Sequence, residues 1–149
     1  MICLILESVD PPMDRDALRR GAGKDLTDTD LRYSAFIFRV TFHVGDTVII
    51  GPRRAVALFD FLVGVANVLR DLRQGVPTSL GFPDSSDRIH FRCTDDRALV
   101  TAPDQRVAVW ADYRELEGAL AEFLADTRTV LFRKAPGLRQ NPHVAQIYA

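Results

Sequence analysis

Residues 53–74 carry apolar side chains almost all round a predicted helix, apart from one narrow polar line. Spacings of four, three and four residues place the members of this line on a single helical face: Asp60, Gly64, Asn67 and Asp71. Another face is covered by apolar residues: Leu58, Phe61, Leu62, Val65, Leu69 and Leu72. A helix with this distribution belongs in the core of a folded domain.

Alternation of apolar and polar residues predicts β-strands on both sides of this helix. In residues 33–42, one side is apolar, with Phe36, Phe38, Val40 and Phe42. Gly45-Asp46 then turns the chain into a second strand at residues 47–50, which completes a hairpin. Further strands are predicted at 1–7, 79–82, 88–94, 98–101 and 107–110, and the last three form an antiparallel meander. Gly51-Pro52 is expected to break the hairpin and open the long helix.

A second helix is predicted to begin at Asp112, whose carboxylate can accept a hydrogen bond from the third amide beyond it. Glu115 stands where the acid of a capping box is placed. Pro136-Gly137 ends this helix, and Asn141-Pro142 can cap a last short turn.

The order of these elements predicts one α+β domain over residues 1–149. We expect an antiparallel sheet of about six to seven strands, made from the hairpin plus the meander, with two main helices packed on one face. Residues 10–32 are expected to form an exposed connection. Strands joined by short turns cannot build a parallel doubly wound sheet, so the nucleotide-binding crevice of such folds is not expected.

Composition is that of a folded globular protein, because 47% of the residues are apolar and 26% are charged. The net charge is −1, so no overall field draws the chain toward nucleic acid or an anionic membrane. The N-terminal apolar run lacks a basic flank and predicts a strand, not a signal peptide or a membrane span. Cys3 and Cys93 lie in strand-like runs, and we expect reduced thiols in a cytoplasmic protein; the alternative is a pair across a sheet.

No catalytic, cofactor or metal motif is present. His43, His90 and His143 are distant from one another in sequence and from the cysteines. No serine stands in a Gly-x-Ser-x-Gly elbow, and residues 21–24 lack the remaining spacing of a phosphate-binding loop. We therefore expect no catalytic residues, no cofactor and no metal site, and we expect nucleic acid not to be a partner because the Phe residues occupy core positions.

Two groups of residues are candidates for a binding surface. The first is the polar face of the meander, with Arg88, His90, Arg92, Thr94 and Arg97. The second is the polar line of the long helix, with Asp60, Asn67 and Asp71, whose alternative is an ordinary solvated edge. The solvated edge is the reading we favour for that line. Gly64 weakens a helix and is compatible with close approach by another backbone.

The last residues of the chain are rich in cations. From Thr127 onward, Arg128, Arg133, Lys134 and Arg139 occur without an Asp or Glu. The interpretation favoured by the sequence is a solvated helix end whose cations complement the helix dipole.

The run IHFRCTDDRALVTA, between a long apolar helix and an amphipathic one, resembles small α+β proteins of high-GC bacteria. With the Phe-rich hairpin and the Asn-Pro terminus, the resemblance spans residues 33–148. Proteins of this kind are similar to immunity proteins that neutralise polymorphic toxins, or to orphan domains. The resemblance carries over no functional residue.

Three hypotheses of function follow. The first is a non-enzymatic cytoplasmic protein that binds another protein, in the form of an immunity-type inhibitor of a toxin. The second is a small enzyme whose site assembles only in three dimensions, for instance from His90 with Asp60 or Asp71. The third is a structural subunit of a larger assembly, which would expose an apolar patch and oligomerise. The sequence leaves the oligomeric state and the identity of the partner open.

Overall fold

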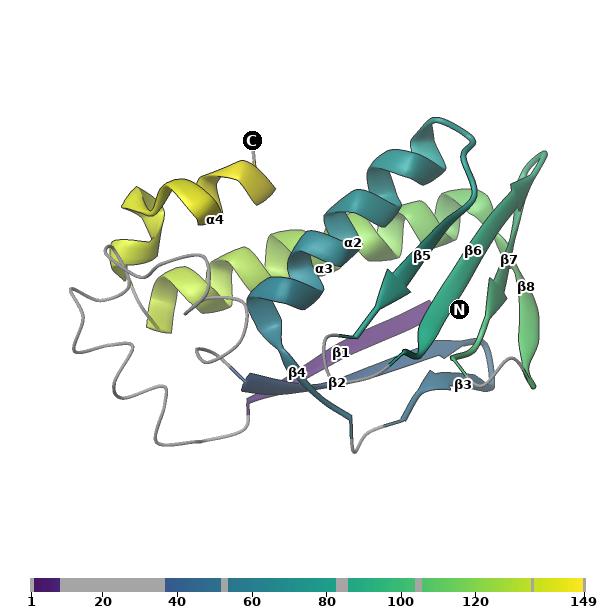
Figure 1. The fold of residues 1–149 in the computed structure, drawn as a ribbon, viewed down its shortest axis with the longest axis horizontal. Helices are drawn as coiled ribbons and strands as arrows, with labels where there is room; N and C mark the ends of the chain where they lie inside the picture. The colour runs from purple at the N-terminus through teal and green to yellow at the C-terminus, as the bar shows by residue number, and fades with distance from the viewer. Residues whose placement is uncertain are drawn as a thin grey trace.

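The computed structural model describes residues 2–8, 37–51, 54–82, 86–103, 106–134 and 136–148. Within these ranges, the chain forms two antiparallel four-stranded sheets, three α-helices and a short 3-10 helix. Figure 1 shows the two long helices side by side, with one sheet beneath them and the other beside them. The predicted α+β class with antiparallel pairing is confirmed. The predicted connection at residues 10–32, and residues 33–36 of the predicted strand, lie outside the described residues.

The first sheet, here called sheet A, is centred on strand β2 (Ile37–Val44). Strand β1 (Ile2–Ser8) pairs along one side of β2. Strands β3 (Thr47–Ile50) and β4 (Ala55–Ala57) pair with its end and its beginning, respectively, along the other side. The predicted inward face is confirmed, because Phe38, Val40 and Phe42 are all buried.

The long helix begins later than the sequence predicted. Residues 55–57 form strand β4, and helix α2 spans Leu58–Arg73. Strand pairing with β2 gives these residues backbone partners and buries Val56, and the Val40 amide also donates to the Arg54 carbonyl at 3.1 Å. The predicted helical start at residue 53 is therefore wrong. The beginning of β2 has a free edge beside it, and residues 55–57 pair with this edge before the helix starts. The sequence pattern does not reveal this pairing. Pro52 lies outside the described residues.

The second sheet, here called sheet B, is the predicted meander extended by one strand. Its order is β5 (Thr78–Gly81), β6 (Arg88–Thr94), β7 (Arg97–Thr101) and β8 (Ala108–Asp112). The turn between β6 and β7 places Asp95 at a φ of 53°, a left-handed conformation that Asp adopts more readily than most residues. Strands that are consecutive in the sequence are thus neighbours in the sheet, as expected for a meander.

The last part of the chain is helical. Helix α3 (Tyr113–Lys134) starts where Asp112 accepts a hydrogen bond from the Glu115 amide at 2.9 Å, as predicted. A 3-10 helix, η3 (Pro136–Gln140), leads into helix α4 (Pro142–Ile147). Asn141 caps α4 by accepting from the His143 amide at 2.9 Å, which confirms the predicted last turn.

The core lies where both sheets meet α2 and α3. Phe42 of sheet A and Phe91 of sheet B pack edge to face, with ring centroids 6.5 Å apart. The prediction of one sheet of six to seven strands is wrong, because among the described strands the hairpin belongs to sheet A and the meander to sheet B, and no strand of one sheet pairs with a strand of the other. Alternation shows which face of a strand is buried but does not specify its neighbour, so the two separate sheets could not be read from it.

Candidate functional site

Sheet B has one open face, formed by alternate residues of its strands. In β6, Ile89 and Phe91 are buried, and the residues between them point to solvent. We call the opposite surface the outer face of sheet B, and its principal residues are Arg88, His90, Arg92, Thr94, Arg97, Leu99, Trp110 and Asp112. Helix α2 packs against the other face, where Leu80 meets Gly64.

The large apolar residues of the outer face lie toward its β8 edge. Cross-strand pairing aligns Arg92 with Leu99 and Leu99 with Trp110, so these side chains form one row over three strands. The Trp110 side chain is 45% exposed, and the Arg97 guanidinium lies 5.5 Å from its ring centroid. A large aromatic residue next to arginines is a common composition of binding hot spots in protein interfaces.

Positively charged residues lie beside these apolar residues, on β6 and β7. Arg88, Arg92 and Arg97 are all exposed, and Arg88 donates to the Ser79 hydroxyl at 3.2 Å. The defined face has one acidic member, Asp112, which stands opposite Arg97 in the register and caps α3, so the three arginines leave the face with a net positive charge. The outer face can therefore attract a negatively charged partner surface.

The four basic residues proposed from the sequence, Arg88, His90, Arg92 and Arg97, do lie together on this face. Sequence reasoning missed that Leu99 and Trp110 share this face. A signal was present in β8, because Val109 and Ala111 must face the core for the strand to be buried at all. That choice turns Trp110 outward.

The polar line of α2 does not form one continuous surface. Asp60 lies half-buried in the first turn, where a carboxylate complements the helix dipole. The Leu80 side chain of β5 covers Gly64. The glycine does permit a close approach to α2, but the approaching group is a side chain and not the backbone suggested from the sequence. Asp71 accepts a hydrogen bond from the Thr78 hydroxyl at 2.9 Å, which joins the end of α2 to the start of β5.

Asn67 is the exposed member of the line. It lies at a small depression of about 180 Å³ between α2 and α4, which His143 and Gln146 also line. Pockets for small molecules and cofactors usually measure about 300–1,000 Å³. This depression is therefore too small to hold a typical cofactor.

The structure does not form the catalytic pair suggested for the enzyme hypothesis. His90 lies on the outer face of β6. Asp71 is bonded to Thr78, which stands opposite the buried Phe91 on the inner face. Sheet B therefore separates the imidazole from the carboxylates of α2.

A larger concave surface lies between α3 and the η3–α4 segment. It encloses about 1170 Å³, and we call it the α3–α4 groove. The residues that line it are Ala121, Leu124, Ala125, Arg128, Thr129, Phe132, Arg133, Arg139, Ala145 and Tyr148. Those on α3 recur every three or four residues, so one helical face forms a whole wall.

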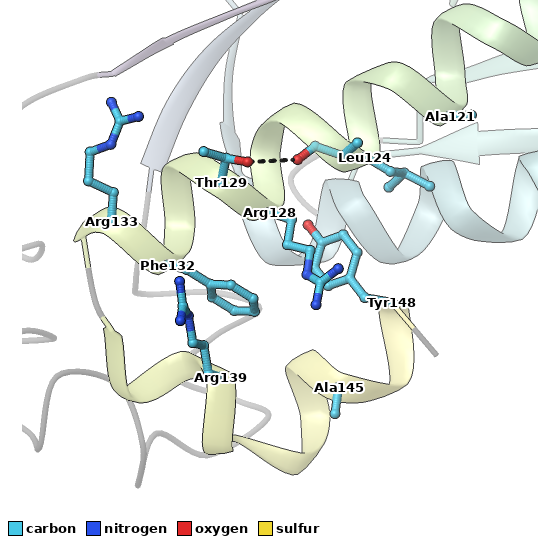
Figure 2. A pocket seen from close by; sticks show the side chains of 10 residues that line it. Ala121, Leu124, Arg128, Thr129, Phe132, Arg133, Arg139, Ala145 and Tyr148 are labelled. Atoms are coloured by element: carbon cyan, nitrogen blue, oxygen red, sulfur yellow. Dashed lines mark hydrogen bonds between the residues drawn. The ribbon is translucent and has the colours of Figure 1, made fainter.

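Two guanidinium groups converge on one aromatic ring in this groove (Figure 2). Arg128 lies 5.5 Å and Arg139 lies 5.4 Å from the centroid of Phe132, and Arg128 is also 5.7 Å from that of Tyr148. Arg133 extends away from this cluster. The helix dipole expected from the sequence accounts for Arg133 in the last turn of α3, but not for Arg128, which lies further from the helix end, or for Arg139, which lies in η3.

Tyr148 anchors the C-terminal segment to α3. Its hydroxyl lies 3.2 Å from that of Thr127, which is 1% exposed and also donates to a carbonyl of its own helix. Burial raises the pKa of Tyr148 above its ordinary value of 10.0, and the opposing effects of Thr127 and the Arg128 charge are smaller.

This pKa shift predicts a loss of stability in alkali. Because the folded state raises the pKa, the contribution of Tyr148 is fully present below pH 10.0 and declines as pH rises through the folded-state pKa. We expect the free energy of unfolding to fall less steeply above pH 10.0 in Tyr148→Phe than in the wild type. Urea unfolding at a series of pH values measures both slopes, and equal slopes would contradict the prediction.

The described residues contain no cluster of three or more metal-ligating side chains. Cys3 lies in sheet A and Cys93 in sheet B, and both are free thiols, so the alternative of a pair across one sheet does not hold. Burial raises the pKa of the Cys93 thiol, which lowers its nucleophilicity near neutral pH. Within the described ranges, none of the helices combines the length and the apolar character needed to cross a membrane.

Two surfaces thus stand out in the part of the chain that the structure describes: the outer face of sheet B and the α3–α4 groove. Both combine arginines with apolar residues. Comparison with models of protein families, with characterised proteins and with solved structures finds no match to this chain.

Proposed function

We propose that this chain is a non-enzymatic binding protein that docks onto an acidic surface of another protein through the outer face of sheet B. The observation that supports this proposal is the exposed Trp110 ring, set among Leu99, Arg92 and Arg97 on a sheet face without a covering helix among the described elements. Burying such a ring on association removes a large apolar area from water.

Charge gives the proposed surface its selectivity. The arginines around Trp110 favour carboxylates on the partner, which speeds encounter and disfavours basic surfaces. Arginine also forms paired hydrogen bonds with carboxylates at little loss of side-chain freedom. Nucleic acid is a weaker candidate, because the defined face offers one large aromatic ring, Trp110, besides the His90 imidazole, whereas platforms that read single strands stack two or three successive bases.

An inhibitor of immunity type is the form of this function that we propose first. The motive is the resemblance of the sequence to such proteins, and the proposed partner is then a toxin with an acidic surface. Inhibition of this kind needs surface complementarity alone, without chemistry on the inhibitor. The site of action in this proposal is the bacterial cytoplasm.

The test combines capture of a partner with variants of the outer face. The wild type, Trp110→Ala and Arg92→Glu are used as bait in lysate of the source organism. Arg39→Glu is the matched control, because Arg39 is exposed on β2 of sheet A and belongs to neither the outer face of sheet B nor the α3–α4 groove. We expect one stoichiometric protein with the wild type and the control, with affinity roughly tenfold lower for each outer-face variant.

Three outcomes would contradict the proposal. A partner that binds all four baits equally would not use the outer face of sheet B. A captured nucleic acid would assign the face to another class of ligand. Capture of the chain by itself, with self-association abolished by Trp110→Ala, would favour the structural-subunit hypothesis. Far-ultraviolet circular dichroism of each bait verifies that the variants are folded.

A further inference from the structure

The α3–α4 groove has features that the proposed function does not use. Its wall and floor come from α3, η3 and α4, and the outer face of sheet B contributes none of its lining residues. The groove is divided along its length. Ala121, Leu124 and Ala125 form an apolar part, and the arginines gather toward the C-terminal end of α3.

Arg128 and Arg139 differ from other arginines of the described chain in having aromatic rings and not carboxylates as their neighbours. Arg73 pairs with Glu117 at 2.9 Å, and Arg54 lies 3.6 Å from Asp87. In the part of the chain that the structure describes, Arg128 and Arg139 form no ion pair, and no carboxylate lines the groove. Two cations directed at one ring repel each other, and an anion placed between them would relieve this repulsion.

The size of the groove indicates a chain segment and not a small molecule. From Ala121 to Arg133, α3 rises by about 18 Å at 1.5 Å per residue. That length matches about twelve residues of a helix or five of an extended chain. The enclosed 1170 Å³ also exceeds the usual range of about 300–1,000 Å³ for small-molecule pockets.

The aromatic rings disfavour a nucleic acid strand as the occupant. Base stacking requires a ring face that is open to the ligand. Guanidinium groups already lie over Phe132 and Tyr148, at 5.4–5.7 Å from the ring centroids. The rings therefore serve to hold the arginines in position, and the arginines present the charge.

We propose that the α3–α4 groove binds an acidic, amphipathic segment of a partner protein. Apolar side chains of the segment occupy the part lined by Ala121, Leu124 and Ala145, and its carboxylates pair with Arg128 and Arg139. This mode corresponds to the docking of an amphipathic helix in a groove, with ionic contacts that fix its direction. The site is separate from the outer face of sheet B, so a failure of one proposal leaves the other intact.

The first experiment measures binding of a synthetic peptide by fluorescence anisotropy. The probe is a fluorescein-labelled helical peptide of about twelve residues, with leucines at i, i+3, i+4 and i+7 and with Asp and Glu toward one end. Two companion peptides replace the acids with lysine or the leucines with serine. We expect the probe to bind with salt-dependent affinity, and each companion to bind at least about tenfold more weakly.

Variants then locate the peptide. Arg128→Gln with Arg139→Gln should weaken binding by about 30-fold to 100-fold, since each arginine supplies a charge-assisted hydrogen bond. Arg128→Lys keeps the charge and should lose less. Ala145→Glu places an acid in the exposed wall of the groove and should compete with the peptide without removing any arginine. Arg39→Gln, on β2 of sheet A, is the control and should change affinity by less than about twofold.

The proposal fails if no peptide of this series binds at millimolar concentration, or if the paired Gln variant binds the probe as the wild type does. It also fails if an oligothymidine of similar length binds more tightly and with the same dependence on Arg128 and Arg139, because the groove would then be a nucleic-acid site. Binding that is retained in Ala145→Glu would place the peptide elsewhere on the chain. Thermal unfolding of each variant verifies that the groove is folded.

Discussion

Phe91→Ala is expected to lower the free energy of unfolding by about 3–5 kcal/mol. The Phe91 side chain is 1% exposed, and its ring meets Phe42 edge to face at 6.5 Å. It is the aromatic contact that joins sheet B to sheet A. Its truncation removes apolar burial and leaves a cavity between the two sheets. Among the described strands, no strand of one sheet pairs with a strand of the other, so side-chain packing is what joins them.

Equilibrium unfolding in urea measures this loss, which would be a large fraction of the stability of a typical domain, about 5–15 kcal/mol. Trp110→Ala is the matched control, because it also truncates an aromatic residue of sheet B, but on the solvated face. We expect the control to change stability by less than about 1 kcal/mol. Equal losses in the two variants would contradict the assignment of buried and open faces to sheet B.

Gly64→Leu is expected to destabilise the protein by about 2–3 kcal/mol. The backbone of α2 at Gly64 is in contact with the Leu80 side chain of β5, so a Cβ at this position would overlap Leu80. Leu80 is itself 3% exposed and can move only by disturbing the core. Overpacking therefore exceeds the gain of about 1 kcal/mol that replacing a helical glycine would otherwise bring.

Gly118→Leu gives the opposite expectation and serves as the control. Gly118 is also in a helix, but a Cβ there would meet no atom within 4 Å. The same substitution should stabilise α3 by up to about 1 kcal/mol.

Leu80→Ala should reduce the destabilisation caused by Gly64→Leu, since the smaller side chain at position 80 leaves room for the larger one at position 64. Additive effects of the two changes would show that Gly64 and Leu80 do not interact.

The elements of this fold follow from local patterns. Strand β6 was predicted residue for residue, because its apolar positions alternate without interruption and a turn follows. The start of α3 and that of α4 were also predictable, since Asp112 and Asn141 satisfy amides within three residues of themselves. In these cases, the interactions that form the element lie inside the segment that predicts it.

The predictions that were wrong depend on distant residues. Residues 55–57 have the composition of a helix start, yet pairing with β2 makes them a strand. The number of sheets depends on which strands become neighbours, and alternation carries no such information. In both cases, tertiary pairing overrides a local preference.

The candidate surfaces divide in the same way. Strand periodicity by itself placed Arg88, His90 and Arg92 on one side of β6 and determined that this side is polar. Only the tertiary structure decided that Trp110 of the edge strand β8 lies beside Leu99 on that surface, because its neighbours across the sheet are set by register. Only the tertiary structure, too, brought Arg139 of η3 next to Arg128 of α3 over one aromatic ring. Sequence spacing governs the geometry within a helix or strand, whereas the meeting of separate segments depends on how the whole chain buries its apolar faces.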